Sequence, residues 1–398
     1  MNAKFTRRHT LAALTLAATA LSPFAARAED TVKIGVILPM TGPSASTGRE
    51  IAAAIKLFQE QKGDKAGGKK VEVIIKDDTG VADITKRLAQ ELVVNDKVAA
   101  IAGFGLTPLA LAAAPIATQA KVPEIVMAAG TAIITEASPY VVRTSFTLPQ
   151  NTMPIAKWAL QNKVKKVVTL VSDYGPGIDA EKTFVATIKD GGGEVLESLR
   201  APLKNPEFAP FLQKAKDLKP DALFLFVPSG QGAALMKQVL ERDFAKDGIK
   251  VIGTGDVTDD EQLNGMGDSV LGMITSHNYS AAHDSPENKA FVAAFEKANP
   301  GLRPNFMAVG GYDGMALIYG ALDKTKGDTD GTKLVEAMKG MSWTSPRGPI
   351  SIDPETRDII QNVYIRKVEK KDGQLYNIEF ETMANIKDPF KAAKAAGK

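Results

Sequence analysis

The fold is decided by residues 99–132, AAIAGFGLTPLALAAAPIATQAKVPEIVMAAGTA. Its first apolar run, residues 99–103, ends in a glycine-rich turn, and Thr107 with Pro108 gives the N-cap and first position of a helix. Residues 124–129 then return as a second apolar run. The pattern predicts a strand, a helix and a second strand parallel to the first.

Polar groups follow both of these predicted strands. Thr107 comes after the first strand, and Gly130 and Thr131 come after the second. Parallel strands joined by a helix finish at the same edge of a sheet, and open α/β sheets bind ligands at that edge. The stretch contains donors and hydroxyl groups but no nucleophile and no acid–base pair. It therefore indicates a binding site rather than an active site.

The same alternation continues on both sides of this stretch. Apolar strands are predicted before it at residues 31–38 and 71–76, and after it at residues 167–172, 194–199, 222–227, 250–255 and 272–280, with amphipathic segments between them. Two successive series of this kind predict two α/β lobes of related design. Three helices and a hairpin around Asp372-Gly373 follow, and an alanine- and lysine-rich tail ends the chain.

The N-terminus has the features of a secretory signal peptide. Three basic residues precede the apolar residues 11–21, and an Ala-Arg-Ala cleavage pattern ends at Ala28. Arg7-Arg8 suggests twin-arginine export, and the ordinary secretory route stays open. Cleavage removes four basic residues and no acid, so the formal charge changes from +3 to 3 − 4 = −1. A mature chain near neutrality gives no reason to expect a nucleic-acid partner.

Composition and motifs exclude several kinds of chemistry. The 398 residues include no cysteine, which excludes disulfides and thiolate catalysis. Gly175 and Gly177 partly match a dinucleotide fingerprint, but the proline between them removes a backbone donor. His277 and His283 lack metal-ligand spacing, and no nucleophile-elbow motif occurs. We therefore expect no metal, no cofactor and no catalytic residue.

The acidic residues in the second half of the chain can be explained by structural roles without any catalytic function. Asp259-Asp260 lies in a polar turn, where solvated acids are common. Asp256 directly follows a predicted strand and either faces the crevice or caps a turn. An exported hydrolase or dehydrogenase using Asp173, Asp256 or His277 is the alternative from another functional class, and the missing nucleophile motif counts against it.

Several motifs occur in a characteristic order: VKIGVILPMTGPSASTG, IAGFGLTP, MAAGTA, VVRTSF, VSDYGPG, GTGDV and GYDGMALI. From about Val32 to about Phe380, the chain resembles the periplasmic substrate-binding proteins of branched-chain amino acid type ABC transporters. The resemblance implies an α/β fold with two doubly wound parallel-sheet lobes joined by a three-crossing hinge, the type I periplasmic binding fold. Ligand is then trapped between the lobes by hinge closure.

The resemblance also implies where the lobes begin and end. Residues 29–147 and 281–345 form the N-terminal lobe, and residues 148–280 and 346–390 form the C-terminal lobe. Residues 1–28 are the signal peptide, and residues 391–398 are a tail. The three crossings are expected near residues 147–151, 278–281 and 345–348.

Binding residues carry over from the family position by position. In the first lobe, Thr107, Ala128, Gly130 and Thr131 correspond to the groups that hold a ligand carboxylate, although the family's ligand threonine falls on Gly130. Tyr174 matches the tyrosine of the second lobe.

Other family positions differ in this chain. Thr47 replaces the first-lobe aromatic residue, and Ser229 lies where the second-lobe aromatic residue is expected. The acid that pairs with an α-amino group falls on Gly255, next to Asp256. Phe104, beside the carboxylate site, is expected to stack on an aromatic ligand.

Together these features predict a periplasmic solute-binding receptor of an ABC importer. The expected ligand is a small carboxylate-bearing molecule, a branched-chain or related amino acid, and the alternative is an aromatic carboxylate or other small organic acid or amide. The expected partners are this ligand and a membrane permease. The receptor itself is expected to be a monomer.

Overall fold

The computed structural model describes Met1 and residues 31–395. Except for Met1, the predicted signal peptide lies outside the described residues, as do the last three residues of the predicted tail. Among the helices of the described residues, none combines the length and apolar character that crossing a membrane requires.

Residues 31–143 build a six-stranded sheet in the order β2-β3-β1-β4-β5-β6. All its pairs are parallel except β2 with β3. Its strands are β1 (Thr31–Leu38), β2 (Lys65–Ala66), β3 (Lys69–Asp77), β4 (Ala100–Gly103), β5 (Glu124–Val126) and β6 (Val141–Arg143). β4 and β5 are the two strands of the stretch 99–132, so the predicted strand–helix–strand unit is present.

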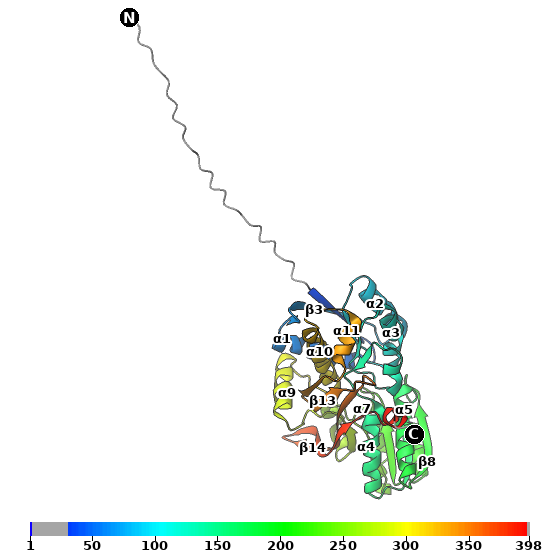
Figure 1. Cartoon of the computed structure of the whole chain (residues 1–398). Coiled ribbons are helices and arrows are strands. Elements are labelled where there is room, and N and C mark those ends of the chain that lie inside the picture. Colours follow the sequence, from blue (N-terminus) through cyan, green and yellow to red (C-terminus); the bar gives the residue numbers. More distant parts are fainter. Residues whose placement is uncertain (2–30, 396–398) are drawn as a thin grey trace. The chain divides into compact units, whose positions relative to one another are not determined.

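Helices from two separate parts of the chain cover this sheet. They are α1 (Ala45–Lys62), α2 (Ala82–Val94), α3 (Thr107–Ala120), α9 (Pro286–Ala298), α10 (Phe306–Lys324) and α11 (Gly331–Met338), with the short 3-10 helix η1 (Ala132–Glu136). α9 and α10 pack on α1, and α11 packs on α10. This sheet with its helices is called the first lobe, and it occupies the upper part of the folded body in Figure 1.

The second sheet has nine strands in the order β12-β13-β14-β11-β10-β9-β7-β8, with β15 paired to β14. They are β7 (Lys166–Ser172), β8 (Glu194–Ala201), β9 (Ala222–Phe226), β10 (Lys250–Thr254), β11 (Ile274–His277), β12 (Ser342–Ser345), β13 (Gly348–Ile352), β14 (Ile359–Lys371) and β15 (Gln374–Ile386). β7 to β11 are parallel, and β11 pairs with β14 in the antiparallel direction. The predicted hairpin is therefore two long antiparallel strands that extend a parallel core.

The second sheet with its helices is called the second lobe. The helices are α4 (Leu148–Gln161), α5 (Gly175–Asp190), α6 (Ala209–Asp217), α7 (Gly232–Glu241), α8 (Leu263–Met266) and α12 (Pro389–Ala395), with the 3-10 helices η2 (Phe244–Asp247) and η3 (Gly267–Val270). α4 packs on α5 and against β10, β11 and β14. α4 begins at Leu148, where Thr147 and Gln150 form a capping box at its N-terminus. α12 belongs to the predicted tail and packs on α4.

The chain passes between the two sheets three times. The passages follow β6, β11 and α11. β12, which the expected boundary at Ser345 assigns to the first lobe, pairs with β13 in the second sheet.

A buried ion pair joins these passages. The guanidinium of Arg347 contacts the carboxylate of Asp313 in α10 at 2.7 Å, and both side chains are almost fully buried. Arg347 also donates to the carbonyl oxygens of Thr144 and Ser145, at 2.5 and 2.9 Å, and to Gln361 Oε1 at 3.0 Å. One side chain thus ties the first passage, the third passage, β14 and the first lobe together.

We expect Asp313→Asn to destabilise the fold strongly, because it leaves the buried charge of Arg347 without a counter-charge. Loss of one partner of a buried pair costs about 3–5 kcal/mol. The control is Glu60→Gln, which breaks the exposed pair with Lys56 and should change the free energy of unfolding by less than about 0.5 kcal/mol. Urea unfolding followed by circular dichroism measures both, and equal effects of the two substitutions would contradict the assignment.

Candidate ligand-binding site

A cavity lies between the lobes where strands of both sheets end. Its lining comes from the turns that directly follow β4, β5, β7, β9 and β10, together with α1, α4 and α10. The lining residues are Ser44, Thr47, Gly105, Leu106, Thr107, Ala128, Ala129, Gly130, Phe146, Leu148, Tyr174, Pro176, Phe226, Pro228, Ser229, Asp256 and Met307. Seven of the nine predicted site residues are among them: Thr47, Thr107, Ala128, Gly130, Tyr174, Ser229 and Asp256.

The cavity is narrow. Its volume is about 30 Å³, which is room for about two water molecules. The lining side chains of the two lobes therefore lie close together, and they must move apart to admit a whole organic ligand.

Thr107 and Thr131 form the polar edge of the first lobe. Their hydroxyl groups share a hydrogen bond of 2.7 Å, which connects the turn after β4 to the turn after β5. The sequence predicted Thr107 as the N-cap of α3, but Thr107 is the first residue of the helix. Leu106 is the N-cap, and it makes no side-chain capping hydrogen bond. Pro108 has no N–H, and the N–H groups of Leu109 and Ala110 donate to the carbonyl oxygen of Leu106. The N–H of Thr107 donates to no backbone carbonyl of the described residues, so it can donate to an anion at the favourable end of the helix dipole.

Arg143, which sequence analysis did not identify, fixes the turn after β5. Its guanidinium donates to the carbonyl oxygens of Ala129 at 3.1 Å and Thr131 at 2.7 Å. A trans peptide points its C=O and N–H in opposite directions. The N–H of Gly130 therefore points away from Arg143, and it donates no hydrogen bond to the backbone of the described residues.

Gly130 is a close-contact position. A Cβ atom there would lie 2.5 Å from Leu148 Cδ2 and 3.0 Å from Phe146 Cε2. A threonine, which the family resemblance places at this position, would collide with both side chains. Phe146 and Leu148 occupy that space and line the cavity instead.

Phe104 does not reach the cavity, so the expected stacking on a ligand is wrong for this geometry. Its backbone is left-handed, with φ of 66°, and its side chain is fully buried in an apolar cluster with residues such as Ile101 and Ala110. Its carbonyl oxygen accepts a hydrogen bond from the N–H of Ala129 at 3.1 Å. Phe104 therefore supports the turn after β5 from behind.

Tyr174 supplies the aromatic wall of the second lobe. It is the N-cap of α5, which begins at Gly175, and its ring is stacked on that of Phe226 with centroids 6.1 Å apart and planes at 21°. Burial and the nearby carboxylate of Asp256 raise the pKa of Tyr174. The hydroxyl group is therefore protonated and can donate a hydrogen bond.

Asp256 presents one uncommitted oxygen to the cavity. Its Oδ2 accepts a hydrogen bond of 2.8 Å from Thr254 Oγ1 and lies 3.5 Å from His277 Nε2. Within the described residues, no hydrogen bond reaches its Oδ1. A carboxylate only accepts hydrogen bonds, so this oxygen favours a donor on a ligand.

A second group of acids links the two lobes. Asp259 of the second lobe accepts hydrogen bonds of 2.9 and 3.0 Å from the side chain of Asn305, and Ser46 of α1 bonds Glu261. Ser229 also bonds Asp259, so its hydroxyl group is already engaged. Asp259 is buried at 1% exposure, which corrects the expectation of a solvated acid in a polar turn. Burial raises the pKa of Asp259 to about 8.

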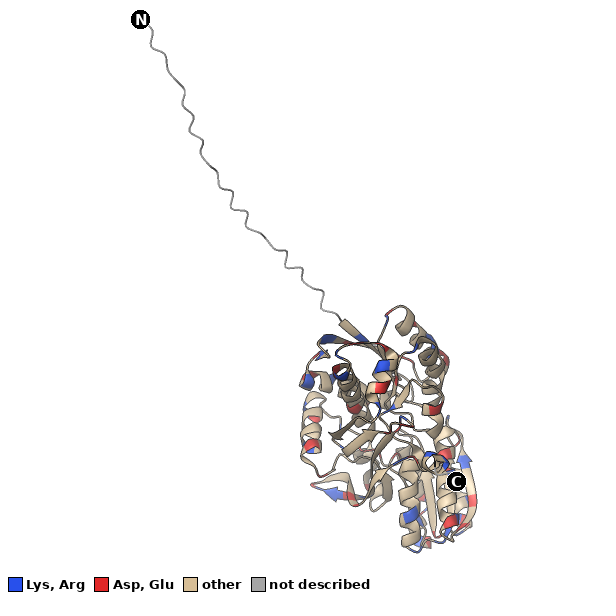
Figure 2. Cartoon of the chain, in the orientation of Figure 1, with Lys and Arg blue, Asp and Glu red and all other residues tan. Residues whose placement is uncertain are grey.

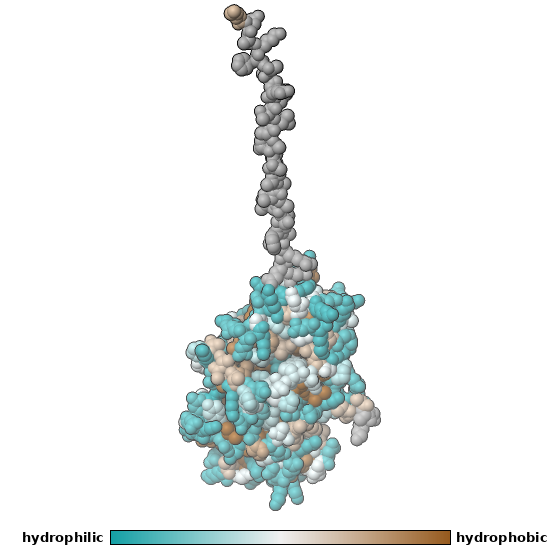
Figure 3. All heavy atoms as spheres, turned by 60° about the vertical axis from the view of Figure 1, so that its left-hand side comes forward, coloured by the Kyte–Doolittle hydropathy of each residue, from teal (hydrophilic) through white to brown (hydrophobic). Residues whose placement is uncertain are grey.

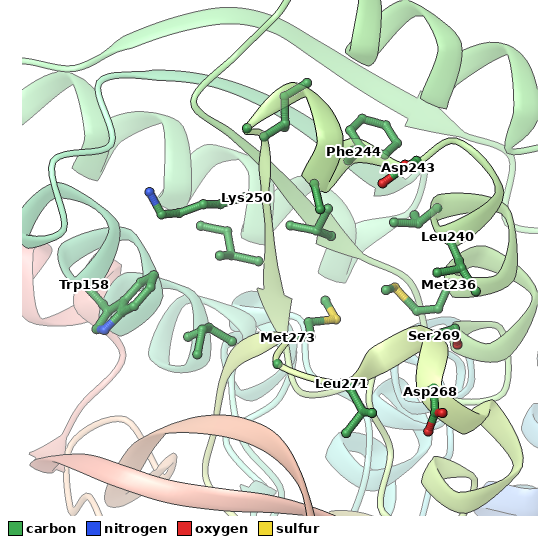
Figure 4. A pocket seen from close by; sticks show the side chains of 18 residues that line it. Trp158, Met236, Leu240, Asp243, Phe244, Lys250, Asp268, Ser269, Leu271 and Met273 are labelled. Carbon is green, nitrogen blue, oxygen red and sulfur yellow. The ribbon is translucent and has the colours of Figure 1, made fainter.

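A larger hollow on the second lobe lies away from this cavity. It is lined largely by apolar side chains, among them Trp158, Leu240 and Leu271 (Figure 4). It lies at the end of the sheet where β10 begins, opposite the end that carries Asp256.

The surface and the acid groups give no sign of a polyanion or metal site. In Figure 2, charges of both signs are interspersed over the two lobes. The face in Figure 3 is mostly hydrophilic, with scattered apolar side chains. Among the described residues, no group of three or more metal-ligating side chains is arranged to hold an ion.

Comparisons with known proteins agree with a ligand-binding cavity between two lobes. A family model described as a periplasmic binding protein matches residues 31–374. Leu/Ile/Val-binding protein homolog 6 of Brucella abortus (strain 2308) is 46% identical over 384 residues, which cover 94% of this chain and 98% of that protein.

Two similar crystal structures contain bound ligands. A solute binding protein of an ABC transporter from Rhodopseudomonas palustris BisB5, in complex with 3,4-dihydroxybenzoic acid, is 64% identical with a TM-score of 0.89, and the match covers 91% of this chain and 100% of that chain. A solute binding protein from Rhodopseudomonas palustris HaA2, in complex with p-hydroxybenzoic acid, is 44% identical with a TM-score of 0.89 and coverage of 92% and 100%.

The raised pKa of Asp259 predicts a pH-dependent stability. The folded state keeps this proton up to about pH 8, while the ordinary value is 3.8. Between these values the folded state binds more protons than the unfolded state, so the contribution of Asp259 to the free energy of unfolding falls as pH rises, by up to about 1.4 kcal/mol per pH unit.

Asp259→Asn should remove this contribution and flatten the decline of stability between pH 5 and 8. The exposed Asp64→Asn is the matched control and should leave the slope unchanged. Urea unfolding across this pH range measures the slope. A wild-type slope in Asp259→Asn would show that Asp259 is ionised in the folded protein.

Proposed function

The chain belongs to the periplasmic binding proteins, the solute-binding receptors of ABC transporters, and on this basis we propose that its ligand is a small aromatic carboxylate with a hydroxyl group on the ring. The family match confirms the resemblance seen in the sequence and the type I fold. The observation that carries the proposal is the narrow cavity itself, with aromatic rings along its walls and polar groups at opposite ends.

The carboxylate end lies in the first lobe. No Lys or Arg side chain is among the cavity's lining residues, so neutral donors must replace the water around an anion. The hydroxyl group and the N–H of Thr107 and the N–H of Gly130 are available for this purpose, since neither N–H donates to a backbone carbonyl of the described residues. Thr131 supports the site through its hydrogen bond to Thr107.

The middle of the cavity favours a flat ring. Phe146, Tyr174 and Phe226 line it together with the apolar side chains of Leu148 and Met307. Aromatic rings gain from offset stacking or edge contacts beyond the area that they bury. A branched aliphatic side chain is thicker than a ring and gains no such contact. The ligands named for the two Rhodopseudomonas palustris proteins are rings of this kind.

The hydroxyl end lies in the second lobe. Asp256 Oδ1 accepts a donor from the ligand, and the protonated hydroxyl group of Tyr174 can donate to the ligand. An O–H group opposite the carboxylate meets both needs. A second carboxylate at this end would face the acceptor-only oxygens of Asp256.

An amino acid is the second candidate. The name of the Brucella abortus relative refers to leucine, isoleucine and valine, and Asp256 could pair with an ammonium group. The aromatic walls favour the aromatic acid.

The remaining expectations form part of the proposal. The receptor acts without catalysis, as a monomer, and delivers its ligand to a membrane permease after export by the signal peptide of residues 1–28. We also propose the lobe boundaries at residues 147 and 280 from the family resemblance. The boundary at residue 345 is proposed with one change, since β12 pairs with β13 and so belongs to the second lobe. The family is periplasmic, which supports this location.

Native mass spectrometry of the purified protein, followed by calorimetry, tests the ligand class. We expect 1:1 binding of 4-hydroxybenzoate or 3,4-dihydroxybenzoate, with no product formed. Leucine and valine should bind at least about a hundredfold more weakly, the equivalent of two 1.4 kcal/mol steps. Tight binding of leucine and none of either aromatic acid would refute the aromatic proposal and support the second candidate.

Thr107→Val should weaken binding of 4-hydroxybenzoate without unfolding the protein. Loss of a hydrogen bond to a charged group costs about 1.5–3 kcal/mol, which is a factor of about 10 to 150 in Kd. Thr187→Val is the control, because the Thr187 hydroxyl group bonds only within its own helix and lies outside the cavity. Wild-type affinity in Thr107→Val would mean that the carboxylate binds elsewhere.

A further inference from the structure

A buried arginine lies directly behind Asp256. A Cβ atom on Gly255 would lie 1.9 Å from Nη2 of Arg366 and 2.7 Å from its Cζ. The guanidinium therefore occupies the space next to the backbone of the residue that precedes Asp256, and no side chain at position 255 can coexist with it.

The surroundings hold Arg366 in place without neutralising it fully. Its side chain is completely buried in β14, and it donates to Thr275 Oγ1 at 3.2 Å and to the carbonyl oxygen of Tyr279. The carboxylate of Asp260 forms an ion pair with Arg366, with its Oδ2 3.7 Å from Arg366 Nη1. That distance is longer than a hydrogen bond, so the pair is looser than a direct contact.

Asp256 is one of the acids near Arg366. The acids close enough to act on Arg366 when they are ionised are Asp260, Glu379, Asp256 and Asp259. Asp259 holds a proton near neutral pH because burial raises its pKa to about 8. Glu379 contacts His283 at 2.7 Å. Arg366 thus supplies positive charge to a region in which Asp256 is the acid that lines the cavity.

His277 does not supply another charge. It is fully buried, with its ring 4.2 Å from that of Phe306 and 5.1 Å from that of Phe146. Burial lowers the pKa of His277, and the Asp256 carboxylate only partly opposes this. The imidazole is therefore neutral at neutral pH. Its contact is with Asp256 Oδ2, so Oδ1 is the oxygen without a hydrogen bond from the described residues.

We propose that Arg366 is a specificity-determining positioning residue, which makes Asp256 select a neutral hydroxyl group and reject a cationic ammonium group. This inference rests on the proposed aromatic-acid function and deepens it. Because a fixed cation already lies behind Asp256, a second cation on the ligand would face like-charge repulsion in a site that excludes water. A phenol O–H donates the same hydrogen bond without that repulsion.

The test compares two ligands that differ at one end. 4-Hydroxybenzoate carries a neutral donor opposite its carboxylate, and 4-(aminomethyl)benzoate carries an ammonium group at that end. Calorimetry on the wild-type protein should show at least about tenfold tighter binding of the hydroxyl ligand, because opposed like charges are costly in a desolvated site. Arg366→Met should shrink this ratio at least about tenfold, and Arg366→Lys, which keeps the charge, should largely preserve it.

The ratio separates a role in selectivity from a purely structural role. A loss of packing alone would weaken both ligands equally and leave the ratio unchanged, which would overturn the inference. Arg357→Met is the matched control: Arg357 lies two residues before β14, is partly buried and bonds backbone carbonyl groups outside the cavity. It should leave the ratio at the wild-type value.

A second variant keeps the test decisive if Arg366→Met does not fold. Asp256→Asn removes the acid and leaves the charge of Arg366 in place. This variant should gain at least about tenfold in affinity for terephthalate, whose second carboxylate then meets the charge of Arg366 without the repulsion of Asp256. No gain would overturn the inference. If the wild-type protein binds neither benzoate derivative, the proposed function fails; if it binds both equally well, only the role of Arg366 fails.

Discussion

The binding site depends on how Arg143 holds the turn after β5. This buried guanidinium donates hydrogen bonds to the carbonyl oxygens of Ala129 and Thr131. Its charge is balanced by Asp358, whose Oδ1 lies 2.8 Å from Arg143 Nε. Because the Ala129 carbonyl group points toward Arg143, the N–H of Gly130 in the same peptide points the other way and is available to an anion. The site can thus bind a carboxylate with neutral donors only, and no cation needs to enter the cavity.

Hydrogen bonds between residues that do not line the cavity also hold the two lobes together. Asp179 of α5 accepts a hydrogen bond of 2.8 Å from the N–H of Ala132, beside the same turn. Asn305, at the N-terminus of α10, bonds Asp259. These contacts flank the cavity, while Arg347 stabilises the passages between the lobes. A rigid connection with polar contacts near the site allows the lobes to close in one defined arrangement.

Much of the fold and part of the site could be predicted from the sequence. Strand ends are visible as apolar runs followed by glycine or a hydroxyl residue, which is why Thr107, Tyr174 and Asp256 were found. Arg143 and Arg366 were not, because they act through contacts with turns that lie far away in the sequence or in another element. Phe104 was misassigned for a related reason: its position beside the site is local, but its left-handed backbone turns the side chain into the core.

The two halves of the cavity therefore have different roles. The first lobe recognises a feature that many small acids share, since any carboxylate can accept from Thr107 and from free amide groups. The second lobe contributes Tyr174, Phe226 and Asp256 to the cavity lining, and under the proposed function these residues contact the part of the ligand that varies. A ligand shifts the lobes toward the closed state only by the difference in its affinity for the two states. Contacts with the second lobe form on closure, so an acid that fits the first lobe alone binds without closing the receptor. Selectivity is thus determined by closure more than by first contact.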